Sequence, residues 1–368
     1  MPFLIKVAPH TLYFNFAAGT SRGTLREKKI FYLQLRHTQL PHRIGIGECG
    51  PIEGLSPETL NDISQKLTSL SVALKKTDDL NFFLLPEWKY ELSLQHYPSL
   101  IFAIEMACMG LCKENPYQLF LNTDHPEQAI PINGLIWMGQ ESFLREQIQE
   151  KLQQGYQCIK MKIGGDQTQQ VLSIIRELRR EYSAEKLMIR VDANGYFDVQ
   201  RAIQLSKELK NLDVHSIEQP LAPGNIAHTK ALISEKLCPV ALDEELISYH
   251  LPEEKERFLQ QVKPAYLVLK PSLHGGFSGC MEWIELCKKY NIGWWITSML
   301  ESNLGLNAIA RFALHVNAKG YQGLGTGGLY TNNIHSPITI KHSGMLSFDS
   351  SKQWDESFWQ KLNWQQVT

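Results

Sequence analysis

Short apolar runs alternate with amphipathic segments along the second half of the chain. Within the amphipathic segments apolar residues recur every three to four positions, as Leu144, Ile148 and Leu152 do, and this spacing predicts helices. The runs between them are rich in β-branched residues and predict strands. Counting from Pro131, the pattern predicts eight strands, at 129–139, 156–163, 187–193, 213–218, 238–243, 265–270, 292–298 and 320–325.

The predicted helices fill the intervals between these strands. They span 141–155, 167–182, 198–211, 226–235, 252–261, 277–290 and 304–316. Strands that alternate with helices in this way run parallel to one another. Eight such units at a regular pitch predict a closed (β/α) barrel over residues 131–335, with functional side chains at the C-terminal ends of its strands.

Residues 1–130 do not repeat at a fixed length. The segments 28–37 and 42–50 predict two antiparallel strands, and 19–25 is expected to be a loop. Helices are predicted at 57–76 and at 98–114, the second of which is apolar nearly all round. This order predicts an α+β capping domain. The fold class is therefore α/β, a modified TIM (β/α) barrel with an α+β N-terminal capping domain.

The tail, residues 336–368, breaks the barrel repeat. It contains one predicted strand, 344–349, and a tryptophan-rich segment. We expect this tail to pack back on the capping domain.

Composition narrows the class of protein. The chain has 368 residues, and its 37 Lys and Arg residues nearly balance 38 Asp and Glu residues, so nothing draws it to nucleic acid or to an anionic membrane. No apolar run approaches the roughly 18 residues of a membrane span, and the N-terminus has no signal-peptide pattern. The seven cysteines are scattered, which is typical of reduced thiols in a cytoplasmic protein.

Five successive strands each end on one charged residue. These residues are Lys162, Asp192, Glu218, Asp243 and Lys270, and they are separated by 25 to 30 residues, the length of one strand plus one helix. Because the C-terminal ends of parallel strands meet at one end of a barrel, the five side chains are expected to lie close together.

Three of these residues are acids on neighbouring strands. Adjacent strands lie about 4.8 Å apart, so Asp192, Glu218 and Asp243 cannot all stay ionised without a cation between them. One acid at a strand end is also typical of a helix cap or a salt bridge, but three in register with flanking lysines predict a metal site. Oxygen ligands with open positions favour one Mg2+ ion, with Mn2+ as an alternative.

The lysines flank this predicted metal. In strand 156–163, Lys160 and Lys162 point to one face and Ile159 and Met161 to the other. Lys270, on the sixth strand, approaches from the opposite side. A lysine beside another cation and a metal has its ammonium form disfavoured, and this makes it a usable base. The alternative is a set of structural ion pairs, although buried ion pairs are costly and seldom repeated for stability alone.

The motifs at these positions resemble the enolase superfamily. They are KMK, DAN, EQP, DE and KP, in this order and pitch, with PSLIFAIEMAC and GECGPIEGLSPE similar to the family's capping helix and capping loop. A lysine on both the second and the sixth strand is similar to the muconate-lactonizing subgroup. The resemblance implies a small carboxylate substrate held by Mg2+ at the three acids. It also implies a lysine that removes the α-proton to form an enediolate.

Two features narrow the resemblance. The seventh-strand segment GWWITSML has no histidine, and the eighth-strand segment GLGTGGLYTNN lacks the Asp-x-Asp that dipeptide epimerases of the subgroup carry. With TSMLES at 297–302, the chain looks most like the o-succinylbenzoate synthase family. That resemblance implies that Lys162 takes the proton and returns it to the departing hydroxyl in a syn dehydration, while Lys270 stays protonated.

Other activities use the same skeleton and stay open. They are racemisation of N-acylamino acids, dipeptide epimerisation and muconate-type cycloisomerisation. A non-catalytic barrel that keeps a metal for stability would be expected to have lost a lysine or an acid, and none is lost.

Several residues are predicted to support the site. Lys160 supplies a positive charge beside Lys162. Arg190 is expected to position Lys162 or the substrate, or alternatively to be a structural partner for the acids. Asn194 and Glu244 are expected to support the metal ligands, with helix capping as the alternative.

The last candidates lie farther along the chain. Ser298 and Glu301 are predicted to contact the substrate carboxylates or their waters, and Glu301 could instead be a partner for Lys270. The segment 19–25 is expected to close over the site as a lid, with an ordinary hairpin connection as the alternative.

Overall fold

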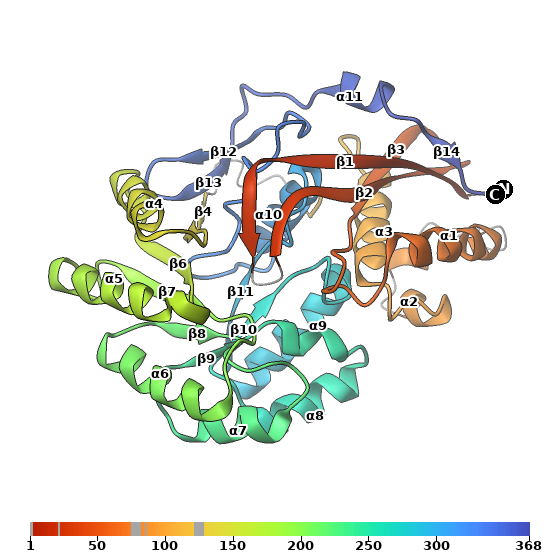
Figure 1. The fold of residues 1–368 in the computed structure, drawn as a ribbon. Helices are drawn as coiled ribbons and strands as arrows, with labels where there is room; N and C mark the ends of the chain where they lie inside the picture. Colours follow the sequence, from red (N-terminus) through yellow and green to blue (C-terminus); the bar gives the residue numbers. More distant parts are fainter. Residues whose placement is uncertain (1–2, 21–22, 75–81, 85–86, 121–128) are drawn as a thin grey trace.

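The computed structural model describes residues 3–20, 23–74, 82–84, 87–120 and 129–368. A curled parallel sheet is surrounded by helices, and an antiparallel sheet with its own helices lies against it (Figure 1). The predicted fold class, a modified (β/α) barrel with an α+β N-terminal cap, is confirmed. None of the helices in these described ranges has the length and apolarity needed to cross a membrane.

The barrel sheet contains seven parallel strands that pair in chain order. They are β5 (Gly134–Ile136), β6 (Cys158–Lys162), β7 (Met188–Asp192), β8 (Ser216–Glu218), β9 (Val240–Leu242), β10 (Tyr266–Leu269) and β11 (Gly293–Ile296). The predicted first strand is divided, because Ile130–Pro131 forms a separate strand, β4, that pairs with the tail.

The prediction of a regular eighth strand at 320–325 is wrong. The chain there makes only isolated parallel bridges, from Gln322 to Ile132 and from Gly323 to Thr297. These bridges still join the two edges of the sheet. Glycine-rich segments make poor strands because they present few side chains to neighbours. Gly323 also passes very close to Thr297, since a Cβ on it would lie 2.2 Å from Thr297 Oγ1.

Helices connect successive barrel strands on the outside of the sheet (Figure 1). Each buries its apolar stripe against the strands, as α5 does with Val171, Ile175 and Leu178. The helices are α4 (Glu141–Gln153), α5 (Thr168–Glu181), α6 (Val199–Asn211), α7 (Ile226–Ser234), α8 (Pro252–Val262), α9 (Gly276–Tyr290) and α10 (Asn303–His315), with short 3-10 turns at Gly165–Gln167 and Glu244–Ser248.

A long hairpin dominates the cap. Strands β1 (Phe3–Thr20) and β2 (Gly23–His37) pair from Phe3↔His37 to Thr20↔Gly23, and β3 (Leu40–Cys49) pairs with β2. The prediction of a loop at 19–25 is therefore wrong for 19–20, which belong to β1, and for 23–25, which belong to β2. Residues 21–22 lie outside the described residues. The sequence analysis missed β1, which contains Pro9. Proline is tolerated there because, among the described strands, only β2 lies beside β1 at Pro9. The other neighbour of β1 is β14, which pairs only with Lys6 and Val7.

Within the described residues, three α-helices and one 3-10 turn complete the cap. They are α1 (Leu60–Leu74), a 3-10 turn at Phe82–Leu84, α2 (Trp88–Glu91) and α3 (Pro98–Leu111). Helix α3 is buried nearly all round, as its composition predicted. It lies so close to β3 that a Cβ on Gly47 would be 1.9 Å from the carbonyl oxygen of Ala103. Only glycine allows this approach.

Replacing Gly47 with alanine is expected to lower the free energy of unfolding by about 3 kcal/mol, because the clash is with backbone and cannot be relieved by a rotamer change. Urea unfolding of both proteins would measure the effect. Gly328→Ala is the matched control, since no heavy atom of the described residues lies within 4 Å of its added Cβ. Equal losses in both variants would contradict this account of the α3–β3 contact.

The tail forms more structure than the single strand predicted. Strands β12 (Ile338–Lys341), β13 (Met345–Phe348) and β4 form an antiparallel sheet. Helix α11 (Glu356–Gln360) follows, and β14 (Gln365–Gln366) pairs with β1 in the cap. Trp359 donates from Nε1 to Tyr117 Oη at 2.7 Å, so the tryptophan-rich segment is tied to the end of the cap.

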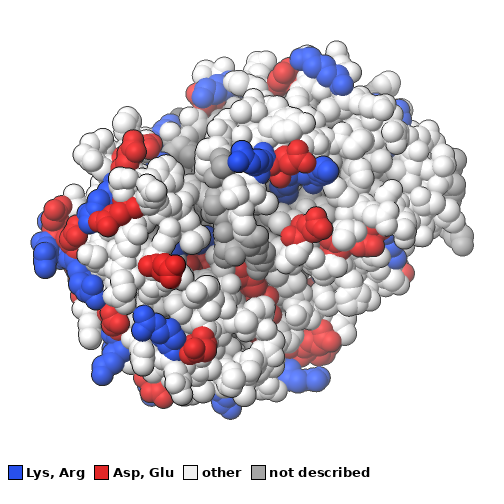
Figure 2. All heavy atoms as spheres, viewed as in Figure 1, with Lys and Arg blue, Asp and Glu red and all other residues white. Residues whose placement is uncertain are grey.

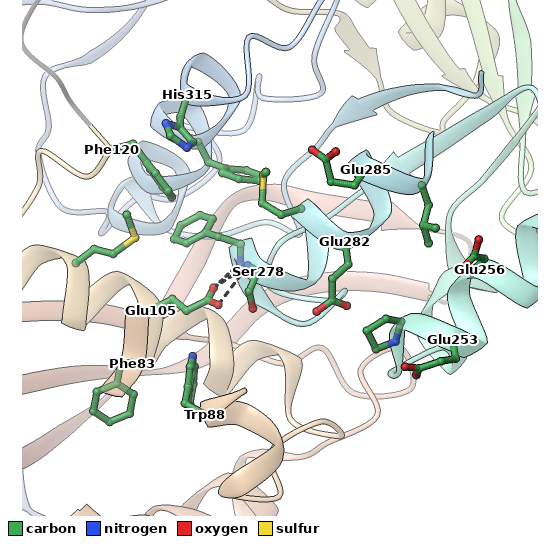
Figure 3. A pocket seen from close by; sticks show the side chains of 16 residues that line it. Phe83, Trp88, Glu105, Phe120, Glu253, Glu256, Ser278, Glu282, Glu285 and His315 are labelled. Atoms are coloured by element: carbon green, nitrogen blue, oxygen red, sulfur yellow. Dashed lines mark hydrogen bonds between the residues drawn. The ribbon is translucent and has the colours of Figure 1, made fainter. Parts of the chain in front are cut away.

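The cap is fixed to the barrel by buried charges. The carboxylate of Glu105 on α3 accepts hydrogen bonds from the backbone N–H groups of Phe277 and Ser278, at the start of α9 (Figure 3). Helix α9 has no capping side chain of its own there, so Glu105 satisfies amides that would otherwise be unpaired. Nearby, Glu282 of α9 pairs with Lys89 of α2 and with Lys255 of α8, at 2.6 Å in both cases.

Candidate active site

The predicted charged residues meet at one end of the barrel. Lys162, Asp192 and Glu218 are Cα partners across β6, β7 and β8, so they lie at the same level of the sheet. Asp243 directly follows β9, and Lys270 directly follows β10. Parallel strands in register thus convert the regular spacing in the sequence into one cluster at the C-terminal ends.

The lysines and acids of this cluster form buried ion pairs. Lys160 Nζ lies 2.9 Å from Asp192 Oδ2 and 2.5 Å from Glu218 Oε1. Lys162 Nζ lies 2.8 Å from the same Asp192 oxygen, and Lys270 Nζ contacts Asp243 Oδ2. Lys160 and Lys162 therefore share one face of β6, as the alternation predicted. The structural pairing that the sequence left open is present.

The acids carry further oxygen atoms that suit a cation. Within the described ranges, Glu218 Oε2 and Asp243 Oδ1 are buried side-chain oxygens without a hydrogen-bond partner. Across the same ranges, no group of three or more His, Cys, Asp and Glu side chains already surrounds a common point as metal ligands. Buried oxygens without donors are costly, and hard cations such as Mg2+ prefer carboxylate oxygen. The donor set therefore fits a divalent ion, provided that the side chains turn from the lysines toward it.

The two acids that pair with Lys160 have pKa values shifted in opposite directions. Burial alone would raise the pKa of Asp192, but Lys160 and Lys162 outweigh burial and hold that pKa well below its usual range. Burial, followed by the charge of Asp192, raises the pKa of Glu218 to about 8. One ammonium group cannot compensate two buried carboxylates, so Asp192, with two lysines, stays ionised and Glu218 holds a proton more readily.

Lys270, in the ion pair seen here, holds its proton more firmly than a free lysine. Burial alone would lower its pKa, but Asp243 and Glu244 outweigh burial and raise it. For Lys270 to become a usable base, the charge of these carboxylates would have to be taken up by a cation.

A cavity of about 210 Å3 opens over this cluster. Lys160, Lys162 and Lys270 line it from the barrel. Leu25 of β2 and Leu55 of the loop after β3 line it from the cap. Described residues of β2 and of the loop after β3 therefore lie over the C-terminal ends of the barrel strands and shape this cavity together with the barrel.

Asn194 and Glu244 lie beside the cluster, where the sequence placed them. Asn194 Oδ1 accepts a hydrogen bond from Lys162 Nζ at 2.5 Å, and its Nδ2 donates to Glu244 Oε1 at 2.9 Å. The backbone of Asn194 is left-handed, with φ 43°, a conformation that asparagine tolerates better than most residues. Asn194 thus links the lysine to the acidic cluster.

Arg190 is near the cluster but does not contact Lys162. Its guanidinium carbon lies 3.9 Å from the ring centroid of Trp295, and Nη1 donates to the carbonyl oxygen of Tyr321. Arg190 therefore braces the barrel interior and supports Trp295, which lines the cavity.

The two candidates after β11 have different positions. Ser298 lines the cavity and shares a 2.7 Å hydrogen bond with Thr326. Glu301 is buried and accepts hydrogen bonds from Ser272 Oγ and from the backbone N–H of Met299. Among the described residues its alternative contact with Lys270 is not seen, because its carboxylate is turned toward Ser272 and the backbone of its own loop. Its contact with the substrate carboxylates stays a prediction.

The sequence analysis missed several residues at the cavity. Trp137, Trp295, Asn133 and Thr326 line it. Their positions at the two ends of β5, on β11 and in the eighth-strand segment were the signal that could have identified them. His274 was also missed. Its Nδ1 accepts the backbone N–H of Lys270 at 3.0 Å, so it fixes the start of the turn that carries this lysine.

A larger hollow, of about 640 Å3, lies elsewhere, between the cap helices and α8, α9 and α10 (Figure 3). Its walls carry aromatic side chains and four outer acids, Glu253, Glu256, Glu282 and Glu285. Among the described residues that line it there is no lysine or arginine, and none of the strand-end residues. The smaller cavity is the candidate active site because it holds the acid and base groups together.

Comparison with known proteins agrees with this architecture. Residues 144–346, more than half of the chain, match the family described as Enolase C-terminal domain-like. The chain belongs to the enolase superfamily. The resemblance inferred from the strand-end motifs is thereby confirmed.

Individual relatives narrow the position within the superfamily. The chain is 37% identical over 353 residues to the o-succinylbenzoate synthase of Desulfotalea psychrophila. The aligned region covers 89% of this chain and 95% of that protein. The crystal structure of MenC from Desulfotalea psychrophila LSv54 superposes with a TM-score of 0.83 at 34% identity, and covers 94% of this chain and 100% of that chain.

A structure with much lower sequence identity shares the fold. The dipeptide epimerase from Cytophaga hutchinsonii, determined with Mg and the dipeptide D-Ala-L-Val, superposes with a TM-score of 0.84 over 100% of both chains at 18% identity. At this identity the likeness shows the fold alone.

Proposed function

We propose that this enolase-superfamily chain is a hydro-lyase of menaquinone biosynthesis. It dehydrates 2-succinyl-6-hydroxy-2,4-cyclohexadiene-1-carboxylate to o-succinylbenzoate in a Mg2+-dependent reaction. The observation that carries the proposal is that Lys162 and Lys270 line one cavity together with Asp192. The chain that holds them is 37% identical to an o-succinylbenzoate synthase over most of its length.

We propose Asp192, Glu218 and Asp243 as the ligands of one Mg2+ ion. They come from consecutive positions of the sheet, and Glu218 and Asp243 each have a buried oxygen without a donor among the described residues. When bound, Mg2+ would supply positive charge that stabilises the negative charge developing on the substrate carboxylate. The same charge would compete with Lys160 and Lys162 for Asp192, and so release these lysines.

We assign the proton transfer to Lys162. Its Nζ would accept the α-proton and then give it to the departing hydroxyl group, so that a carbon–carbon double bond forms and water leaves. Both groups leave from one side of the ring, so one acid–base group is enough. Asn194 Oδ1, 2.5 Å from Lys162 Nζ, would orient the amine during both transfers.

Lys270 is proposed to act as a fixed cation. It stands on β10 while Lys162 stands on β6, with β7, β8 and β9 between them, so the two amines face the cavity from different sides. Its hydrogen bond with Asp243 and the support of His274 hold it in place. A protonated Lys270 would stabilise negative charge on the opposite face of the ring.

The walls of the cavity suit a carbocyclic substrate. Trp137, Trp295 and Leu135 supply apolar and aromatic surface, while Ser298 and Thr326 supply hydroxyl groups for the polar succinyl chain. Dipeptide epimerases need a carboxylate for the substrate's ammonium group, and the segment 323–333 contains none. This favours the lyase over the epimerase. The same lysines and acids also suit proton exchange at the α-carbon of an N-succinylamino acid, so racemisation is the second candidate.

We further propose that residues 1–130 and the tail 336–368 form one capping unit over a barrel of residues 131–335. The pairing of β14 with β1 and the hydrogen bond from Ser71 Oγ to the carbonyl oxygen of Val367 support this division. On the face shown in Figure 2, positive and negative side chains are interspersed without a large region of one sign. This distribution favours a small-molecule substrate over a nucleic-acid partner.

Direct assay tests the function. With Mg2+, the purified protein is expected to convert the cyclohexadiene carboxylate to o-succinylbenzoate, followed by loss of the diene absorbance and by chromatography of the product. N-succinylamino acids, tested in parallel, are expected to racemise more slowly. Racemisation without any dehydration would contradict the proposal and favour the second candidate.

A further inference from the structure

One wall of the active-site cavity is held in an unfavourable backbone conformation. Ser298, Met299 and Leu300, from the loop that follows β11, line the cavity. Leu300 has φ 59°, in the left-handed region, where a residue with a Cβ is strained. Neighbouring groups must hold the loop in this conformation.

A buried lysine of the cap makes the decisive contacts with this loop. Lys28, on β2, is 6% exposed, and its Nζ donates to the carbonyl oxygens of Met299 and Leu300 at 2.9 and 3.0 Å. Tyr330 Oη also donates to the carbonyl oxygen of Leu300, at 2.7 Å. An ammonium group is costly to bury, and here it is aimed at two successive carbonyl groups around the strained residue.

Two buried acids hold the loop on either side of Leu300. Glu301 Oε2 accepts the backbone N–H of Met299 at 2.7 Å. Glu48, on β3, accepts from the backbone N–H of Ser302 at 2.8 Å and from Ser302 Oγ at 2.5 Å. Burial lowers the pKa of Lys28, and Glu301 and Glu48 oppose that shift. The cap thus contributes one cation and one anion to the same active-site loop.

We propose that Lys28 is a positioning residue that sets how tightly the barrel site binds its substrate. By holding the carbonyl groups of Met299 and Leu300, it keeps the Leu300 side chain at the cavity wall against the substrate. This inference rests on the proposed function, because it takes this cavity to be the substrate site. Lys28 takes no part in the proton transfer, so its loss should weaken binding and leave the chemical step nearly intact.

Steady-state kinetics of Lys28→Met tests this role, because methionine keeps most of the side-chain length and removes the charge. KM is expected to rise on the order of tenfold while kcat changes by less than about threefold, the pattern of lost uniform binding. Lys29→Met is the matched control, since the Lys29 side chain is 68% exposed on the same strand. A purely structural role would reduce the folded fraction, and so lower apparent kcat with KM unchanged; that result would overturn the proposal.

The left-handed backbone gives a second test. Glycine adopts this conformation without strain, so in a Leu300→Gly background the loop should hold its shape with less help. There the effect of Lys28→Met on KM is expected to shrink from about tenfold to less than about threefold. An equal effect in both backgrounds would show that Lys28 acts through something other than Leu300. Tyr330→Phe, which removes only the hydroxyl group that donates to the carbonyl oxygen of Leu300, should also raise KM. This variant replaces Lys28→Met in the test if Lys28→Met does not fold.

Hydrogen exchange separates this inference from the proposed function. In Lys28→Met, amides of 298–302 are expected to exchange on the order of tenfold faster than in the wild type or in Lys29→Met, because the loop opens locally more often. This readout needs no substrate. A wild-type protein without dehydratase activity would refute the proposed function, whereas unchanged exchange at 298–302 would refute the role of Lys28.

Discussion

Lys162→Ala is expected to lower the rate of dehydration by on the order of a hundred- to ten-thousand-fold, the usual effect of losing an acid–base group. The same variant should stop exchange of the substrate's α-proton with solvent deuterium, measured by NMR, because the group that receives the proton is gone. Lys207→Ala, at an exposed position on α6, is the control and should leave both rates unchanged.

Lys270 distinguishes this dehydration from a two-base reaction. If Lys270 serves as a fixed cation, Lys270→Arg keeps the charge and should impair dehydration less than Lys270→Ala does. Both Lys270 variants should retain α-proton exchange, since Lys162 is intact. Near wild-type dehydration by Lys162→Ala together with an inactive Lys270→Arg would mean that the roles of the two lysines are reversed.

Chelation of divalent cations is expected to abolish activity, and added Mg2+ to restore it. The physical reason is that Asp192, Glu218 and Asp243 present carboxylates from neighbouring strands, and these would repel the substrate carboxylate unless a cation lay between them. Full activity in excess chelator would contradict the metal assignment and leave the cluster as a set of structural ion pairs.

Glu218→Gln tests the metal site without an activity assay. Titration calorimetry is expected to show Mg2+ binding weakened at least on the order of a hundredfold, because even partners one shell beyond a metal's ligands contribute ten- to a hundredfold. The barrel should stay folded, since burial and Asp192 already raise the pKa of Glu218 to about 8, so a neutral amide is tolerated there. Glu285→Gln, on the exposed face of α9, is the control.

The barrel and its charged cluster followed from local patterns in the sequence. Alternation within β6 placed Lys160 and Lys162 on one face, because side chains in a strand alternate whatever the rest of the chain does. The pitch of the repeat then placed Asp192 and Glu218 on neighbouring strands, and the structure pairs them in register. These helices and strands were predictable because their formation depends mainly on residues a few positions away in the sequence.

Segments that depend on distant partners were predicted less well. Strand β1 contains Pro9 and was missed, because only its pairing with β2 and the limited length of β14 make a proline acceptable there. The eighth strand was predicted as regular, but the glycines of 323–328 leave only bridges to Ile132 and Thr297. In both cases the outcome depends on which chain lies alongside.

The sequence by itself determined a parallel barrel with three acids and two lysines at its strand ends, because strand alternation and the length of each repeat are local properties. Only the tertiary structure decided what surrounds them. Glu301 turned from the cavity to the backbone of its own loop, and Lys28 came to hold carbonyl groups 271 and 272 residues away. Such contacts arise when the cap docks on the barrel, and no pattern within either segment specifies them.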